Sequence, residues 1–143
     1  METKPIKYLI PWDFTPVPEF ALKYAVKFCK VSESSSLVEL VHVVQAGGMF
    51  SKSKISEEDA REKFKIDQQR IKEKYGIEVK TTLLEGNLFD TISEYASEIQ
   101  ANMVIMGTHG IKGVQKLTGS WALKVIAGSD IPFLVVQDEP IND

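Results

Sequence analysis

The stretch Tyr8-Leu9-Ile10-Pro11-Trp12-Asp13-Phe14-Thr15-Pro16 joins a strand pattern to a helix start. Its apolar part, residues 8–12, does not alternate between polar and apolar residues, which is typical of a strand buried on both faces. Thr15 followed by Pro16 is a helix-start signal, with Thr15 as the cap and Pro16 at the first helical position. We therefore expect a strand followed closely by a helix. The predicted apolar stripe of that helix comprises Val17, Ala21, Tyr24 and Phe28.

The rest of the chain repeats this order of strand and helix. Further strands are predicted at residues 37–44, 77–84, 103–106 and 133–136, and helices at 57–75, 88–99 and 121–127. Ser56 opens the second helix with a capping box, Gly76 is its expected C-terminal stop, and Asn87 is the expected cap of the third. Strands that alternate with helices indicate a parallel sheet with helices on both faces. The predicted fold class is therefore α/β, doubly wound.

Length and composition exclude several classes of protein. The chain has 143 residues, the size of one domain, and a net charge of −3, which argues against a nucleic-acid-binding protein. Cys29 is the one cysteine, so a disulfide within the chain and a cysteine-based zinc site are both excluded. The first residues lack the apolar region of a signal peptide, and the apolar runs are too short to span a bilayer. We expect a cytoplasmic protein without a membrane partner.

In a doubly wound sheet, ligands bind beyond the carboxyl ends of the strands. The richest segment of this kind runs from Gly107 to Ser120, with Gly107, Gly110 and Gly113 after a strand and Gly119-Ser120 before a helix. Glycines allow close backbone approach, and a helix N-terminus offers free N–H groups to an anion. The segment therefore predicts a phosphate-binding loop. The alternative is a loop whose glycines serve only to form turns.

Several short pieces of the chain, taken in order, carry a resemblance to a known family. They are residues 8–15, Val41-His42-Val43, Glu85-Gly86, Met106-Gly107-Thr108-His109-Gly110, Gly119-Ser120 and residues 132–136. Together they resemble the universal stress protein family over nearly the whole chain. The resemblance implies one domain over residues 1–143, with a three-layer, five-stranded parallel sheet of order 3-2-1-4-5, the adenine nucleotide alpha hydrolase-like fold.

The same resemblance implies an adenine nucleotide site, for ATP or AMP, with Mg²⁺ arriving with the phosphates. Pro11, Asp13 and Val43 would bind the adenine and ribose end. The family's nucleotide-binding branch carries Gly-x2-Gly-x9-Gly-Ser/Thr, whereas eight residues separate Gly110 from Gly119 here. The residues assigned to the ribose and phosphates are Gly107, His109, Gly110, Gly119, Ser120 and the backbone at Trp121.

Two of these residues have alternative interpretations. Asp13 at a strand end can accept hydrogen bonds from an amine or hydroxyl, or it can cap the helix that starts near Pro16. His109 can act as a general acid or a γ-phosphate ligand, or it can simply hold the loop or face solvent. We favour the second role for His109, because no nucleophile with a matching base is evident. No catalytic residue and no metal-ligand spacing is predicted.

Two functions stay open from the sequence. The first is a small nucleotide-binding stress-response regulator that acts by binding and conformation, with slow ATP hydrolysis at most. The second is a dimeric interaction module of the same fold that has lost nucleotide binding. In the implied strand order, Phe133-Leu134-Val135-Val136-Gln137 is an uncharged edge strand. An exposed apolar edge strand promotes aggregation unless another segment or chain covers it. The resemblance suggests that a second subunit pairs with this strand in a homodimer.

Overall fold

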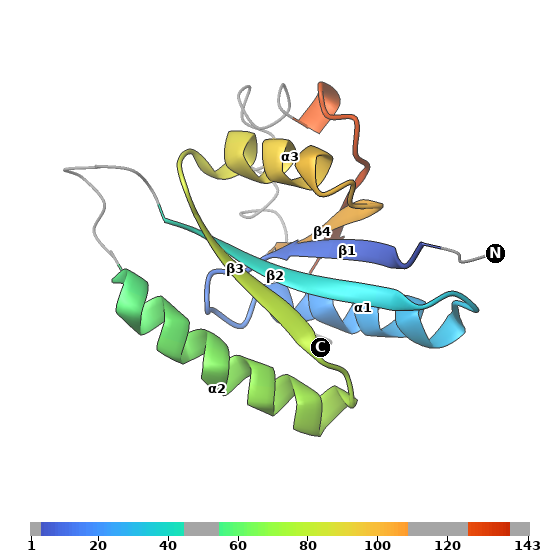
Figure 1. Cartoon of the computed structure of the whole chain (residues 1–143), viewed down its shortest axis with the longest axis horizontal. Helices are drawn as coiled ribbons and strands as arrows, with labels where there is room; N and C mark the ends of the chain where they lie inside the picture. The colour runs from blue at the N-terminus through green and yellow to red at the C-terminus, as the bar shows by residue number, and fades with distance from the viewer. Residues whose placement is uncertain (1–3, 45–54, 109–125, 138–143) are drawn as a thin grey trace, which may run out of the picture.

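A computed structural model describes residues 4–44, 55–108 and 126–137 of the chain. Its elements confirm the alternating order predicted from the sequence (Figure 1). The strands are β1 (Ile6–Pro11), β2 (Ser36–Val44), β3 (Val79–Glu85), β4 (Met103–Thr108) and β5 (Phe133–Gln137). The helices are α1 (Pro18–Val31), α2 (Glu57–Tyr75) and α3 (Leu88–Glu98). The predicted helix at 121–127 lies almost entirely outside the described residues.

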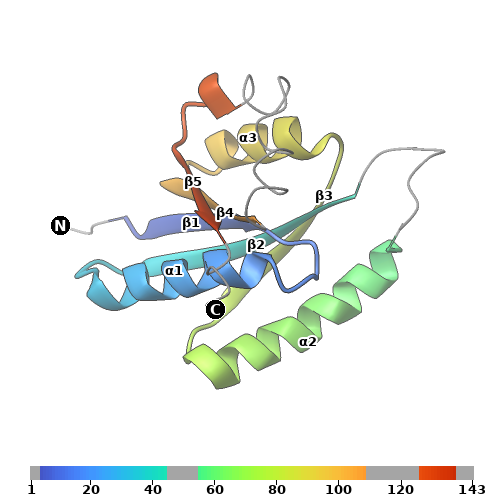
Figure 2. The same ribbon diagram turned by 180° about the vertical axis from the view of Figure 1, so that it is seen from behind.

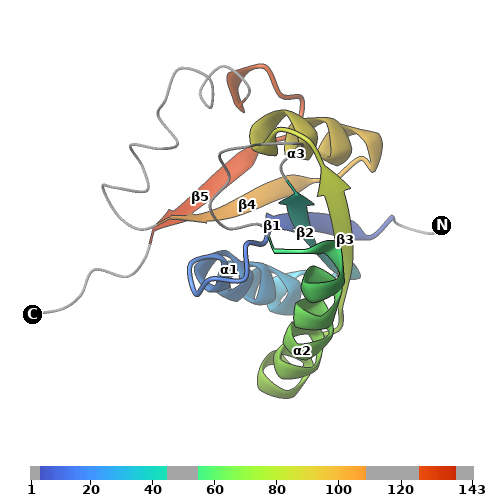
Figure 3. The ribbon, with the colours of Figure 1, turned by 90° about the vertical axis from the view of Figure 1, so that its left-hand side faces the viewer.

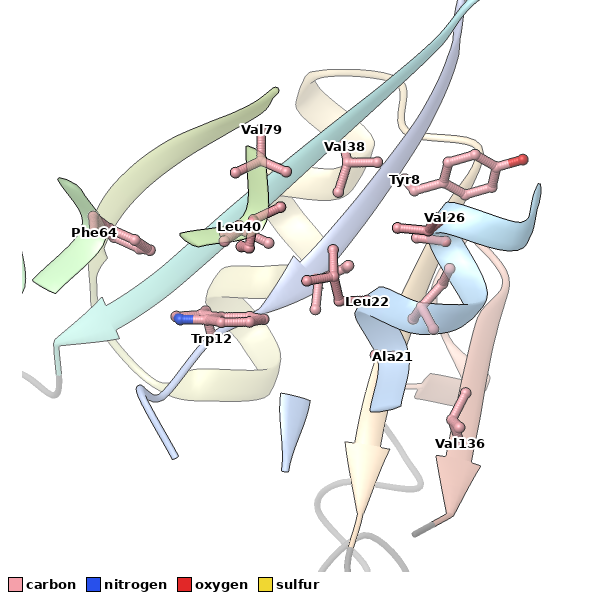
Figure 4. Packing of buried hydrophobic residues seen from close by; sticks show 14 residues of the cluster. Tyr8, Trp12, Ala21, Leu22, Val26, Val38, Leu40, Phe64, Val79 and Val136 are labelled. Atoms are coloured by element: carbon pink, nitrogen blue, oxygen red, sulfur yellow. The ribbon is translucent and has the colours of Figure 1, made fainter. Parts of the chain in front are cut away.

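The five strands form one parallel sheet in the order β3-β2-β1-β4-β5, as predicted. Helices α1 and α2 cover one face of this sheet, and α3 covers the other (Figures 2 and 3). Successive strand residues alternate between the two layers, so Tyr8 and Ile10 pack toward α1 whereas Leu9 packs toward α3. Figure 4 shows the first layer, in which Leu22, Leu40 and Phe64 are fully or almost fully buried.

Helix α2 follows its sequence signals closely. The hydroxyl of Ser56 accepts a hydrogen bond from the Asp59 amide, and Gly76 ends the helix in the left-handed conformation with φ +72°. Glycine adopts that conformation without a steric penalty. The buried residues of α2 are Ala60, Phe64 and Ile71.

Helix α1 begins two residues later than predicted. Pro18, and not Pro16, occupies the first helical position, and Thr15 does not cap the helix. The Thr15 amide and hydroxyl instead both donate to Asp13 Oδ1. These hydrogen bonds hold residues 13–15 in a separate turn before the helix. The predicted stripe is also wrong at Tyr24, which is 42% exposed. The buried positions of α1 are Pro18, Ala21, Leu22, Ala25 and Val26.

Candidate functional site

The carboxyl ends of the strands bring together those predicted site residues that the structure describes. Pro11 is the last residue of β1, Val43 is the penultimate residue of β2, and Gly107 is the penultimate residue of β4. Because β2, β1 and β4 are adjacent and parallel, these residues lie along one edge of the sheet. Val43 is buried, whereas Asp13, just beyond β1, is exposed.

Asp13 organises the turn that leads from β1 to α1. Its Oδ1 accepts hydrogen bonds from the Thr15 amide at 2.9 Å and from the Thr15 hydroxyl at 2.6 Å. Phe14, between them, has a φ of +65°, a conformation that is costly for a residue with a side chain. Asp13 thus stabilises a strained turn and does not cap α1. No described residue donates a hydrogen bond to its other oxygen, Oδ2, although the carboxylate is exposed.

Gly107 lies unusually close to the start of α1. A Cβ atom placed on Gly107 would be 2.3 Å from the carbonyl oxygen of Val17 and 3.2 Å from the Cα of Pro18. Real Cβ atoms essentially never approach another atom as closely as the first of these distances. The glycine therefore allows α1 to pack against β4, and this packing accounts for Gly107 without a ligand.

Gly107 is the one residue of the predicted phosphate end within the described part of the chain. His109, Gly110, Gly119, Ser120 and Trp121 lie outside the described residues, so the phosphate end remains a prediction. Within residues 4–44, 55–108 and 126–137, no group of three or more metal-ligating side chains occurs. In the same segments, no helix combines the length and the apolar character needed to cross a membrane.

Sequence reasoning missed the side-chain contacts that support the Asp13 turn. Trp12 is 3% exposed, and its indole Nε1 donates to Asp67 Oδ2 on α2 at 2.9 Å. The ring of Phe14 packs against His42 and Phe64, at centroid distances of 4.8 and 4.9 Å. The sequence shows two aromatic residues, Trp12 and Phe14, on either side of Asp13, but their partners on β2 and α2 follow only from the fold.

A second missed feature is the buried carboxylate of Glu39, in the middle of β2. Glu39 is 9% exposed and accepts hydrogen bonds from Thr82 Oγ1 at 2.7 Å and from the hydroxyl of Tyr95 on α3. Burial and the hydrogen bond to Glu39 raise the pKa of Tyr95. This cluster lies under α3, away from the carboxyl edge, so its evident role is to fix α3 on the sheet.

The strand order and the placement of helices on both faces define a doubly wound α/β protein, and the carboxylate of Asp13 is exposed at the carboxyl edge of its sheet. Residues 7–137 match the model of the universal stress protein family, and the chain belongs to that family. The family resemblance noted from the sequence is thereby confirmed.

Individual relatives agree with this assignment. Universal stress protein MJ0531 of Methanocaldococcus jannaschii is 30% identical over 141 residues, covering 92% of this chain and 81% of that protein. The solved structure of MJ0577, from the same organism, is 29% identical with a TM-score of 0.63, covering 94% and 97% of the two chains. UspA from Lactobacillus plantarum, 16% identical with a TM-score of 0.69, covers 94% of this chain and 99% of its own and shares the fold.

Proposed function

We propose that this universal stress protein is a cytoplasmic regulator that binds an adenine nucleotide, ATP or AMP, and acts through binding and conformation rather than fast catalysis. The observation that carries the proposal is the exposed Asp13 carboxylate, held in a strained turn at the carboxyl edge of the sheet with one oxygen unused by the described residues. A strained residue kept in place by its surroundings is characteristic of a functional site.

The chemistry of Asp13 favours the base and sugar end of a nucleotide. A carboxylate accepts hydrogen bonds from an amine or a ribose hydroxyl, and it repels a phosphate. The proposed adenine and ribose contacts are therefore Asp13, Pro11 and Val43. The phosphates would bind Gly107, Gly110, Gly119, Ser120 and the backbone at Trp121, with His109 beside them, and any Mg²⁺ would arrive with the phosphates.

Two solved proteins of this fold hold adenine nucleotides. A universal stress protein from Archaeoglobus fulgidus, 23% identical to this chain with a TM-score of 0.65, was solved in complex with dAMP. Another universal stress protein, 12% identical with a TM-score of 0.64, was solved with cAMP. Those ligands belong to those proteins, and they make adenine nucleotides the natural first probes for this chain.

Thermal unfolding with and without ATP, ADP and AMP tests the proposal. The wild type should be stabilised by each nucleotide that it binds, because a ligand that binds only the native state raises the melting temperature. Asp13→Ala should remove that stabilisation. Glu33→Ala is the matched control, since Glu33 is also exposed and acidic but lies between α1 and β2, at the amino edge of the sheet. Equal stabilisation of all three proteins would contradict the role of Asp13.

An interaction module that pairs through β5 is the second candidate function. The start of the β3 edge is covered, because Gln68 Nε2 on α2 donates to the Val79 carbonyl at 3.0 Å and Lys72 pairs with Glu78 at 3.3 Å. The β5 edge has an uncharged sequence, and Val135 is 39% exposed. A homodimer through Phe133–Gln137 would cover that apolar edge. If the wild type shows no stabilisation by millimolar adenine nucleotides, this function replaces the first.

A further inference from the structure

Trp12 occupies the position between the end of β1 and the exposed carboxylate of Asp13. Among residues 11–16 it is the one buried residue, at 3% exposure. Figure 4 shows its indole packed among the side chains of the α1 and α2 layer, near Leu40 and Leu22. Any shift of Trp12 would therefore move the turn that carries Asp13.

Three hydrogen bonds fix Trp12, two of them to β2 and one to α2. Its amide donates to the Val41 carbonyl at 2.7 Å, which continues the pairing of β1 with β2. Its carbonyl bonds to Nδ1 of His42 at 2.8 Å. Its indole Nε1 donates to Asp67 Oδ2 on α2 at 2.9 Å. Together these bonds hold both the backbone and the side chain of Trp12.

The bond to His42 defines the state of that imidazole. A carbonyl oxygen can only accept, so Nδ1 of His42 must carry the hydrogen and donate it to Trp12. The Phe14 ring packs on the same imidazole, with centroids 4.8 Å apart. His42 thus contacts the residues immediately before and after Asp13.

We propose that His42 and Asp67 are positioning residues that fix the Asp13 carboxylate for its ligand by holding Trp12. This inference rests on the proposed nucleotide function and adds to it a role for two side chains outside the predicted site. We call Trp12 and its two side-chain partners, His42 and Asp67, the clamp. Asp67 Oδ1 also lies 3.4 Å from Arg70 Nε, and both terminal nitrogens of Arg70 donate to the carboxylate of Glu19 on α1. These contacts link the clamp to α1.

Two pairs of variants test the clamp. Asp67→Ala removes the acceptor for the indole, whereas Asp67→Asn keeps an oxygen acceptor in the same place. His42→Leu removes the donor to the Trp12 carbonyl, whereas His42→Asn keeps an N–H donor near the position of Nδ1. We expect Asp67→Ala and His42→Leu to weaken AMP binding about tenfold. The conservative variants should stay within about threefold of the wild type.

A second measurement reads the position of the turn without a ligand. The Thr15 amide donates to Asp13 Oδ1, so its rate of hydrogen exchange with water, measured by NMR, reports whether the turn is held. Asp67→Ala and His42→Leu should speed this exchange about tenfold. Amides in the middle of α3, on the opposite face of the sheet, should exchange as in the wild type, which a general loss of stability would not allow.

The outcomes separate this inference from the proposed function. If wild-type protein binds no AMP, the nucleotide proposal fails, and Thr15 exchange alone decides whether the clamp exists. If AMP binds and both disruptive variants bind it as tightly as the wild type, the positioning role is wrong. Unchanged Thr15 exchange in both variants would overturn the clamp in either case.

Discussion

Replacing Gly107 with alanine tests how tightly α1 packs against the carboxyl end of β4. The new Cβ would lie 2.3 Å from the Val17 carbonyl oxygen, whereas ordinary contact begins near 3.4 Å. The start of α1 and β4 would have to separate by about 1 Å, the difference between these two distances. Adding a methyl group to a well-packed site typically lowers the free energy of unfolding by about 1–3 kcal/mol. We expect the upper end of this range, because the new atom would lie between the backbone of β4 and that of the start of α1.

Urea unfolding of the protein without nucleotide, followed by circular dichroism, measures this cost. With a slope of roughly 1.5 kcal/mol per molar urea, a loss of about 3 kcal/mol lowers the midpoint by about 2 M. Gly76→Ala is the control, because Gly76 has a φ of +72° but no atom within 4 Å of its added Cβ. Backbone strain alone should cost that variant about 1 kcal/mol. An unchanged midpoint for Gly107→Ala, or equal losses in the two variants, would refute the packing argument.

Three further predictions concern the ion pairs, the buried carboxylate and the open sheet edge. Burial raises the pKa of Glu19, but hydrogen bonds from Arg70 and Tyr75 and the nearby positive charges outweigh it and lower the pKa below 4.5. The free energy of unfolding of Glu19→Gln should therefore be about 1–2 kcal/mol lower than that of the wild type at pH 7. This difference should disappear as the pH falls below 4.5, because Glu19 then becomes protonated. Melting temperatures that differ equally at pH 7 and pH 3 would contradict this prediction. Tyr95→Phe removes a hydroxyl donor from buried Glu39 and should cost about 1.5–3 kcal/mol in urea unfolding, whereas an unaltered midpoint would count against the role of that cluster. Val135→Lys should shift a wild-type dimer toward monomer in light scattering, and a wild-type monomer at micromolar concentration would defeat the dimer proposal.

Local patterns predicted most of the fold. Buried strands without alternation, the Ser56 cap and the Gly76 stop are read from neighbouring residues, and all of them agree with the structure. The start of α1 could not be read in this way, because Thr15 and Pro16 make as good a local start as the later proline. Capture of the Thr15 amide by Asp13 moves the helix start, and that turn requires a positive φ at Phe14 that no local rule predicts.

Contacts between residues that are far apart in the sequence explain why the candidate site could be predicted only in part. The rule that ligands bind at the carboxyl edge indicates the segments at the ends of the strands, and the family resemblance implies Pro11, Asp13 and Val43 within them. The support of Trp12 by Asp67 joins residues 55 positions apart, and the Tyr95–Glu39 pair spans 56 positions. Such partners are fixed by how α2 and α3 pack on the sheet. For the same reason, the sequence suggests a phosphate contact at Gly107 and does not reveal the close approach of α1.

Titration calorimetry of the purified protein with AMP and ATP tests the central claim most directly. The account predicts saturable binding of one nucleotide per chain in the wild type and a marked loss of affinity in Asp13→Ala, with Glu33→Ala unaffected. Absence of binding heat, together with no thermal stabilisation, at millimolar AMP and ATP would contradict it.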